Sequence, residues 1–155
     1  QGVSSAASDV YKRQASHKVI VFAPFRHSIE TIMRELNKDG ITCEAINGDV
    51  SMNKRTDIFK RFQESKDPRV LVIQPQAASH GVTLHAANVA VFWSPVMSVE
   101  TYIQCCARID RAGQKNHMTI VHIQGSPVER RIYHMLQNKI DIHTKLVDLY
   151  RDEIE

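Results

Sequence analysis

The sequence predicts an α/β protein with a parallel sheet that helices cover on both faces. Short apolar runs alternate along the chain with longer stretches in which apolar residues recur at the helical period. The first run, residues 19–23, is apolar at every position, which suits a strand buried on both faces. Because strands that alternate with helices usually pair in parallel, five such runs indicate one doubly covered sheet.

The first helix is expected between Pro24, which ends the first strand, and Asp39-Gly40, a dipeptide at which helices commonly end. Its apolar residues share one face of the helix, and they are Ile29, Ile32, Met33 and Leu36. The second strand, residues 41–46, follows directly and turns at Asn47-Gly48.

Ser51 is suited to cap the second helix, because its hydroxyl can accept a hydrogen bond from the first turn. The apolar face of that helix consists of Ile58, Phe59 and Phe62. Residues 69–73 and 88–93 are the third and fourth expected strands, and residues 118–123 are the fifth. Between the last two strands we expect a helix over residues 99–112.

The chain is expected to end in a long helix that begins after Ser126, with Pro127 first and Glu129 at capping-box spacing. Its apolar stripe comprises Val128, Ile132, Met135, Leu136, Ile140, Leu146 and Val147. This helix either braces the domain or docks a further lobe. Residues 1–16 are small, polar and aperiodic, which predicts a disordered or non-native leader before a domain formed by residues 17–155.

Composition sets bounds on the setting of the chain. At 155 residues it has the size of one domain, and Lys and Arg exceed Asp and Glu by three, which permits a polyanionic partner without requiring one. Cys43, Cys105 and Cys106 form neither a disulfide framework nor a paired C-x-x-C site, which is typical of reduced thiols in an intracellular protein. No apolar run reaches the roughly 18 residues of a membrane span, and the histidines lack ligand spacing, so we expect no metal site.

Residues 104–114 concentrate the charge chemistry of the chain. In a helix, Gln104, Arg108 and Arg111 share one face, and Gly113 is placed to end that helix. Two neighbouring guanidiniums repel each other unless an anion lies against them, and their planar geometry suits a phosphate. The spacing alone fits a solvated helix surface better, so the phosphate interpretation depends on the rest of the chain.

Three further segments accompany this one in a fixed order. They are residues 19–25, residues 46–49 with Arg55, Phe59 and Phe62 downstream, and residues 70–88. Together the four segments resemble motif IV, a Gly turn with its helix, motif V and motif VI of the second RecA-like lobe of superfamily 2 helicases. The likeness is greatest to Swi/Snf-type DNA translocases and their phage relatives, and it covers residues 18–149.

The sequence departs from that family's pattern at three places. Ala107 replaces a common Gly before the first arginine, and Ala78-Ser79 replaces a pair of Gly residues in motif V. Thr83 stands where relatives carry Asn or Asp. The second and third changes bear on ribose contact and on coupling between the lobes, whereas the two arginines match the pattern.

The resemblance implies a role in ATP hydrolysis. Arg111 would be the arginine finger, Arg108 would hold the γ-phosphate, and Gln104 would orient the pair. Gly81 and Thr83 would join the two arginines in contacting ATP. The chain has no G-x-x-x-x-G-K-[ST] segment and no Asp-Glu pair after an apolar strand. ATP and Mg²⁺ would therefore bind only together with an N-terminal RecA-like lobe, and the domain alone would bind neither and would not act as a hydrolase.

The resemblance also implies contacts to a nucleic-acid backbone, with duplex DNA as the expected partner. The residues concerned follow the strands, and they are Phe25, Arg26, Gly48, Asp49, Ser51, Gln76, Ser79 and His80. His80 fits a solvated loop equally well, Ser51 can cap a helix at the same time, and Arg55 fits a structural ion pair better than a ligand contact. A non-catalytic remnant that binds nucleic acid or protein is the alternative. The expected location is the cytoplasm, nucleoid or nucleus, or a phage-infected cell.

Overall fold

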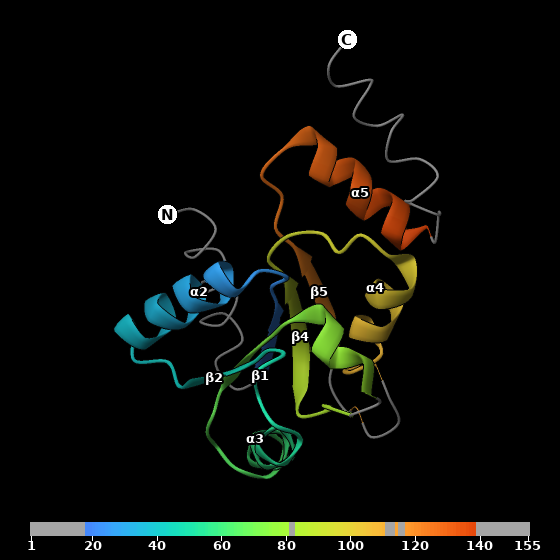
Figure 1. The fold of residues 1–155 in the computed structure, drawn as a ribbon. Coiled ribbons are helices and arrows are strands. Elements are labelled where there is room, and N and C mark those ends of the chain that lie inside the picture. The colour runs from blue at the N-terminus through green and yellow to red at the C-terminus, as the bar shows by residue number, and fades with distance from the viewer. Residues whose placement is uncertain (1–17, 81–82, 111–113, 115–116, 139–155) are drawn as a thin grey trace.

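The computed structural model describes residues 18–80, 83–110, 114 and 117–138. Five strands in these ranges pair in parallel in the order β2-β3-β1-β4-β5 (Figure 1). They are β1 (Lys18–Phe22), β2 (Cys43–Ile46), β3 (Val70–Ile73), β4 (Ala87–Phe92) and β5 (Thr119–His122). The parallel α/β sheet expected from the sequence is confirmed.

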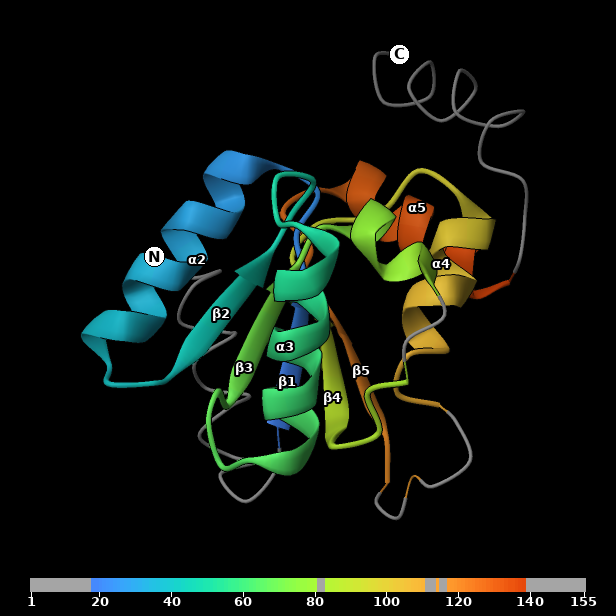
Figure 2. The ribbon, with the colours of Figure 1, turned by 60° about the horizontal axis from the view of Figure 1, so that its bottom comes forward.

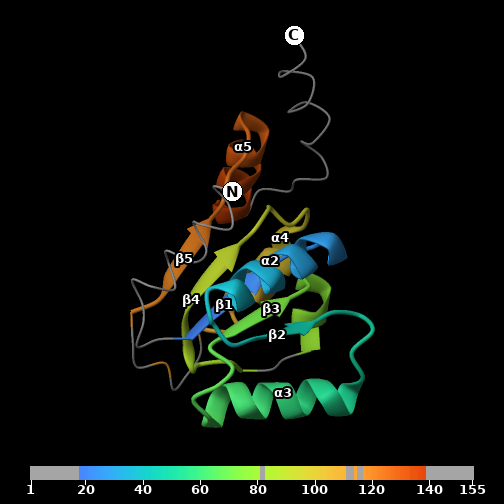
Figure 3. The same cartoon turned by 90° about the vertical axis from the view of Figure 1, so that its left-hand side faces the viewer.

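Side chains that alternate along the strands build one apolar layer on each face of the sheet. On one face, Ile20 and Phe22 of β1 pack with α3 (Met52–Glu64), α4 (Val99–Cys106) and α5 (Pro127–Gln137). On the other face, Val19 and Val21 pack with α2 (Arg26–Lys38). Consequently α2 and α3 lie on opposite sides of the sheet (Figure 3).

The helix α2 ends at Asp39-Gly40, as the sequence predicts. Gly40 has a φ of 71°, and its N–H donates to the carbonyl of Asn37 at 3.1 Å. The N–H of Ile41 donates to the carbonyl of Leu36 at 3.0 Å, which completes a Schellman motif. Only glycine adopts this left-handed conformation cheaply, so Gly40 fixes the direction in which the chain enters β2.

Serine side chains cap the other three helices. The hydroxyls of Ser51, Ser98 and Ser126 accept hydrogen bonds from backbone N–H groups in the first turns of α3, α4 and α5, at 3.2–3.3 Å. The predicted caps at Ser51 and Ser126 are confirmed. The longest helices, α2 and α3, have 13 residues each, and no helix in the described ranges is long and apolar enough to cross a bilayer.

The helix α4 is shorter than the sequence predicts. We expected it to reach residue 112, but it ends at Cys106 and continues as a tighter turn over residues 107–110, called the arginine turn below. The N–H of Arg108 donates to the carbonyl of Cys105 at 3.2 Å, and its Nε donates to the carbonyl of Gln104 at 2.9 Å. The arginine side chain thus takes the place of a backbone donor at the helix end.

Several expectations fall outside the described residues. These are the leader at residues 1–16, the helix stop at Gly113, and the part of the C-terminal stripe at Ile140, Leu146 and Val147. The described part of the last helix, α5, packs Ile132, Tyr133, Met135 and Leu136 into the larger apolar layer. The three cysteines are free, as expected, and Cys105 is buried.

The conformation of Gly40 predicts a stability difference between two glycines. Gly40→Ala is expected to lower the free energy of unfolding by about 1–2 kcal/mol, because alanine is strained at a positive φ. Gly48→Ala is the matched control: its added Cβ would meet no atom within 4 Å, so we expect a change of less than about 1 kcal/mol. Chemical denaturation of both variants checks this, and equal losses would contradict it.

Candidate nucleic-acid edge and arginine turn

The loops that follow β1, β2 and β3 meet along one edge of the sheet, because parallel strands all end on the same side (Figure 2). We call this the carboxyl edge, made by residues 23–26, 47–51 and 74–76. It brings together most of the residues predicted to contact nucleic acid: Phe25, Arg26, Gly48, Asp49, Ser51 and Gln76. Ser79 and His80 lie on the 3-10 helix η1 (Pro75–His80), which begins at the same edge.

An exposed ion pair joins the first two loops. The guanidinium of Arg26 lies 2.6 Å from the carboxylate of Asp49, and these side chains are 60% and 68% exposed. Such a pair contributes little to stability, because water screens both charges. A phosphate at this edge can therefore compete with Asp49 for Arg26 without opening the core.

Gln74, which the sequence analysis did not select, holds the three loops together. Its Nε2 donates to the carbonyl of Pro24 at 3.1 Å, and its Oε1 accepts from the N–H of Gly48 at 3.3 Å. Its position in the sequence could have identified it, because it is the first polar residue after β3. That strand is buried at all four positions and lies between β1 and β2. One amide thus fixes the spacing of the loops that follow three adjacent strands.

The helix α2 begins at this edge without a capping side chain. Phe25 at its N-cap makes no side-chain cap bond, and its first turn contains no acidic residue. The other three helices each have a serine cap. Backbone N–H groups at such a helix start point outward beside Arg26, an arrangement that favours anions.

Arg55 keeps the second loop in shape. The sequence favoured an ion pair for this residue, and that expectation is wrong: Nε donates to the carbonyl of Val50 at 2.9 Å and a terminal nitrogen donates to that of Asn47 at 3.0 Å. The loop turns back toward α3, so its carbonyls lie closer to Arg55 than any carboxylate of the described residues does. The structural role is confirmed, and its acceptors are backbone oxygens.

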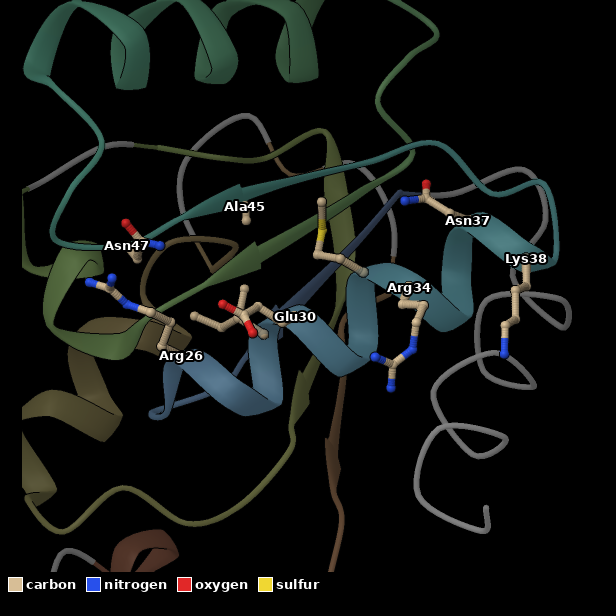
Figure 4. Close-up of a pocket in the computed structure, with 9 residues that line it drawn as sticks. Arg26, Glu30, Arg34, Asn37, Lys38, Ala45 and Asn47 are labelled. Atoms are coloured by element: carbon tan, nitrogen blue, oxygen red, sulfur yellow. The ribbon is translucent and has the colours of Figure 1, made fainter.

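A groove of about 790 Å³ extends from the carboxyl edge along α2 and the edge strand β2 (Figure 4). At its near end the side chains of Arg26 and Asn47 point toward each other. Farther along, Arg34 and Lys38 point away from β2. Arg26 thus lies at the near end of the groove, whereas Asn37 lies at the far end with its amide on the β2 side, where Cys43 Sγ donates to its Oδ1 at 3.5 Å.

Motif V runs from the carboxyl edge, where β3 ends, to the other end of the strands, where β4 begins. It leaves β3 as η1, which packs against α4 through Ala77 and Ala78. Gly81 lies outside the described residues, and the chain resumes at the half-buried Thr83 before β4 begins. The segment thus connects the predicted nucleic-acid contacts with the arginine turn that follows α4.

The arginine turn is hydrogen-bonded to this second end of motif V. The N–H of Leu84 donates to the carbonyl of Arg108 at 2.8 Å. The side chain of Gln114 donates from Nε2 to the carbonyls of Ala87 at 2.7 Å and Ile109 at 3.1 Å. A shift of the arginine turn must therefore move the start of β4 or break these bonds.

The side chain of Arg108 is buried. It is 5% exposed, so the alternative of a solvated surface arginine is wrong for this position. Its Nε bond to Gln104 holds the guanidinium against the end of α4. The amide of Gln104 is half-buried and lies 3.5 Å from the carboxylate of Glu100, whereas Arg111 lies outside the described residues.

The described residues offer few groups that can coordinate a metal ion. They contain no group of three or more His, Cys, Asp or Glu side chains that could hold one. The sequence also lacks a P-loop lysine and its Gly-rich cradle.

Beneath α4 lies a cluster of Tyr102, His122 and Tyr133, in which both tyrosines are buried and His122 is half-buried. The hydroxyl of Tyr102 lies 2.9 Å from Nε2 of His122, and the imidazole stacks on Tyr133 with ring centroids 4.2 Å apart. Burial lowers the pKa of His122 and raises those of both tyrosines, so all three side chains are neutral at pH 7. Burial also raises the pKa of Cys105 to about 12 and that of Cys106 to about 11, which keeps these thiols protonated.

The fold, the ordered motifs and the arginine turn define the second lobe of a superfamily 2 helicase of the Swi/Snf type. Residues 3–113 match the family described as the helicase conserved C-terminal domain. Since this match covers most of the chain, the protein belongs to that family.

Individual relatives agree with this assignment. The chain is 30% identical over 133 residues to a SWI/SNF-related matrix-associated actin-dependent regulator of chromatin subfamily A-like protein 1 homolog of Caenorhabditis elegans, covering 85% of this chain and 19% of the relative. It is 31% identical over 125 residues to the DNA repair protein RAD5 of Yarrowia lipolytica, and the match covers 79% of this chain and 12% of that protein. The chain thus spans less than a fifth of the length of these relatives.

A solved structure shows the same fold. The C-terminal part of the Fun30 ATPase domain superposes with a TM-score of 0.78, at 20% identity, over 85% of this chain and 44% of that one. The RecA-like α/β architecture expected from the sequence is therefore confirmed by the structural likeness as well as by the sheet itself.

The two hydrogen bonds of Gln74 predict that replacing this residue lowers the stability of the domain. Gln74→Glu replaces the donor to the carbonyl of Pro24 by a carboxylate oxygen, so we expect the free energy of unfolding to fall by about 1–3 kcal/mol. The same exchange at Gln137, which is exposed at the end of α5, should change it by less than about 0.5 kcal/mol. Urea denaturation checks both, and a Gln74→Glu protein as stable as its parent would contradict the role.

The burial of His122 predicts a dependence of stability on pH. Its pKa is lowered in the folded state, so the unfolded state binds the proton more readily and stability is fully present above an unfolded pKa of about 6.5. Stability is then lost as the pH falls below that value toward the folded pKa. His122→Phe keeps a ring against Tyr133 but cannot titrate, so denaturation between about pH 8 and pH 5 should give a shallower decline for the variant. Parallel declines would contradict this.

Proposed function

We propose that this chain is the second motor lobe of an ATP-dependent DNA translocase. In this proposal the lobe presents Arg108 and Arg111 to ATP held by a first lobe, and its carboxyl edge grips a nucleic-acid backbone. The observation that supports it most is the hydrogen bond from Leu84 to the carbonyl of Arg108, because it ties the motif V segment to the arginine turn. Two ligand regions that must act in concert are thereby mechanically connected.

On the ATP side, this lobe supplies positive charge. The first lobe would bind ATP with Mg²⁺, whose charge offsets that of the phosphates. The sequence places Arg111 three residues after Arg108. In the proposal Arg111 stabilises negative charge on the transferring phosphoryl group. Arg108, held by Gln104, sets the position of the turn and lies beside the γ-phosphate when the lobes close.

On the nucleic-acid side, the carboxyl edge offers mainly uncharged donors. Backbone N–H groups at the start of α2 and the Ser51 hydroxyl lie along the same edge as the exposed Arg26, whose pair with Asp49 is screened by water. Contacts of this kind follow phosphates and carry no base specificity, as a protein that moves along DNA requires. The names of the relatives, a chromatin regulator homolog and a DNA repair protein, support DNA as the partner and an intracellular, DNA-containing compartment as the location.

Coupling between the two sides would run along α3 and motif V. The helix α3 begins at Ser51 on the carboxyl edge, and near its other end Gln63 accepts a hydrogen bond from the N–H of Ala86 at 2.9 Å. Leu84, two residues earlier, is bonded to the arginine turn. Loading of the carboxyl edge is thus transmitted to the arginines through rigid elements and hydrogen bonds.

Removal of the proposed arginine finger tests this function. In the full protein with a first lobe, Arg111→Ala is expected to slow DNA-stimulated ATP hydrolysis by about a thousandfold or more, equivalent to about 4 kcal/mol of barrier. Arg34→Ala, which removes an exposed arginine of α2, should leave the rate nearly unchanged. The measurement is a steady-state ATPase assay with saturating DNA. Hydrolysis that persists in Arg111→Ala at the parent rate would refute the motor proposal and favour the non-catalytic alternative.

A further inference from the structure

We propose that His122 is a positioning residue that couples α5 to α4 and so fixes the arginine turn for ATP hydrolysis. The inference rests on the proposed function, because the turn matters for catalysis only if its arginines meet ATP. It concerns residues outside the four motifs: His122 ends β5, and its two partners come from different helices.

The link from β5 to α4 is a directional hydrogen bond. Nε2 of His122 and the hydroxyl of Tyr102 share a hydrogen bond of 2.9 Å. Tyr102 is 8% exposed, and its ring also packs on Phe92 of β4 at a centroid distance of 5.0 Å. Ring packing alone permits sliding, whereas this partly buried hydrogen bond adds a directional constraint on the rotation of α4 over the sheet.

The link from β5 to α5 is a stacked pair of rings. The imidazole of His122 and the phenol of Tyr133 are inclined by only 18° with centroids 4.2 Å apart. The Tyr133 hydroxyl donates to the carbonyl of Phe92 at 3.2 Å, so this ring is itself anchored to the sheet. His122 is therefore held on one side by α5 while its ring nitrogen holds α4.

The position of α4 is passed directly to the arginine turn. Tyr102 lies on the helix two residues before Gln104, whose carbonyl binds Arg108 Nε. A small rotation of α4 moves this carbonyl and the turn that follows it. Because misplacement of a catalytic group by about 1 Å can lower a rate by up to a hundredfold, loss of the His122 link should appear in turnover.

The experiment removes the hydrogen bond while the aromatic packing stays. The double variant Tyr102→Phe with His122→Phe has no buried hydroxyl or imidazole left unpaired, so it should unfold near the parent temperature. In the full protein with saturating DNA, we expect kcat for ATP hydrolysis to fall about tenfold with KM for ATP unchanged, since the misplaced group acts in the transition state. His134→Phe is the matched control: it replaces an exposed histidine of α5 whose ring lies beside Asn138 at the helix end, so kcat should stay within about twofold of the parent.

Each result decides the inference. A double variant with parental kcat overturns the inference, as does a fall in kcat that His134→Phe shares to the same extent. If the double variant does not fold at the assay temperature, Tyr102→Phe alone is read in the same way, and an unchanged kcat overturns the inference. Failure of the proposed function is separable, because it shows as parental hydrolysis in Arg111→Ala whatever the state of His122.

Discussion

Parallel pairing of strands that are buried on both faces is the constraint on which the arrangement of the whole lobe depends. All strands end at one edge, so the starts of α2, α3, α4 and α5 gather there and the end of α4 lies toward the opposite edge. The candidate nucleic-acid contacts and the arginine turn are therefore kept apart by the sheet. Motif V must cross between them, which it does as η1 followed by the segment bonded to Arg108.

The two arginines at these edges differ in the way that their proposed roles require. Arg26 is solvated and paired with an exposed carboxylate, so it exchanges partners at little free energy and suits a backbone that moves past it. Arg108 is buried and held by a carbonyl at the helix end, so its place is set before any ligand arrives. A preorganised charge such as that of Arg108 stabilises a transition state more strongly in a closed, water-poor cleft than in water.

Apolar periodicity was sufficient to predict the sheet, because each strand run is bounded by a strong local signal such as Pro24, Gly40 or the Ser51 cap. The end of α4 could not be predicted in this way, since it depends on which donor reaches the carbonyl of Gln104. Gln74 and His122 could not be selected for a related reason: their hydrogen-bond partners are 20 or more residues away in sequence, and only the fold brings them within bonding distance.

The helix α4 is constrained at both of its functional contacts, and the two constraints have different strengths. Near its middle, Tyr102 is bound to His122, whose ring is in turn held by α5. At its end, the arginine turn is hydrogen-bonded to Leu84, which precedes β4. Through Gln114 it is also bonded to Ala87, the first residue of β4. A displacement of the motif V segment therefore acts on the arginine turn through these hydrogen bonds, whereas the contact of Tyr102 with His122 anchors the body of α4.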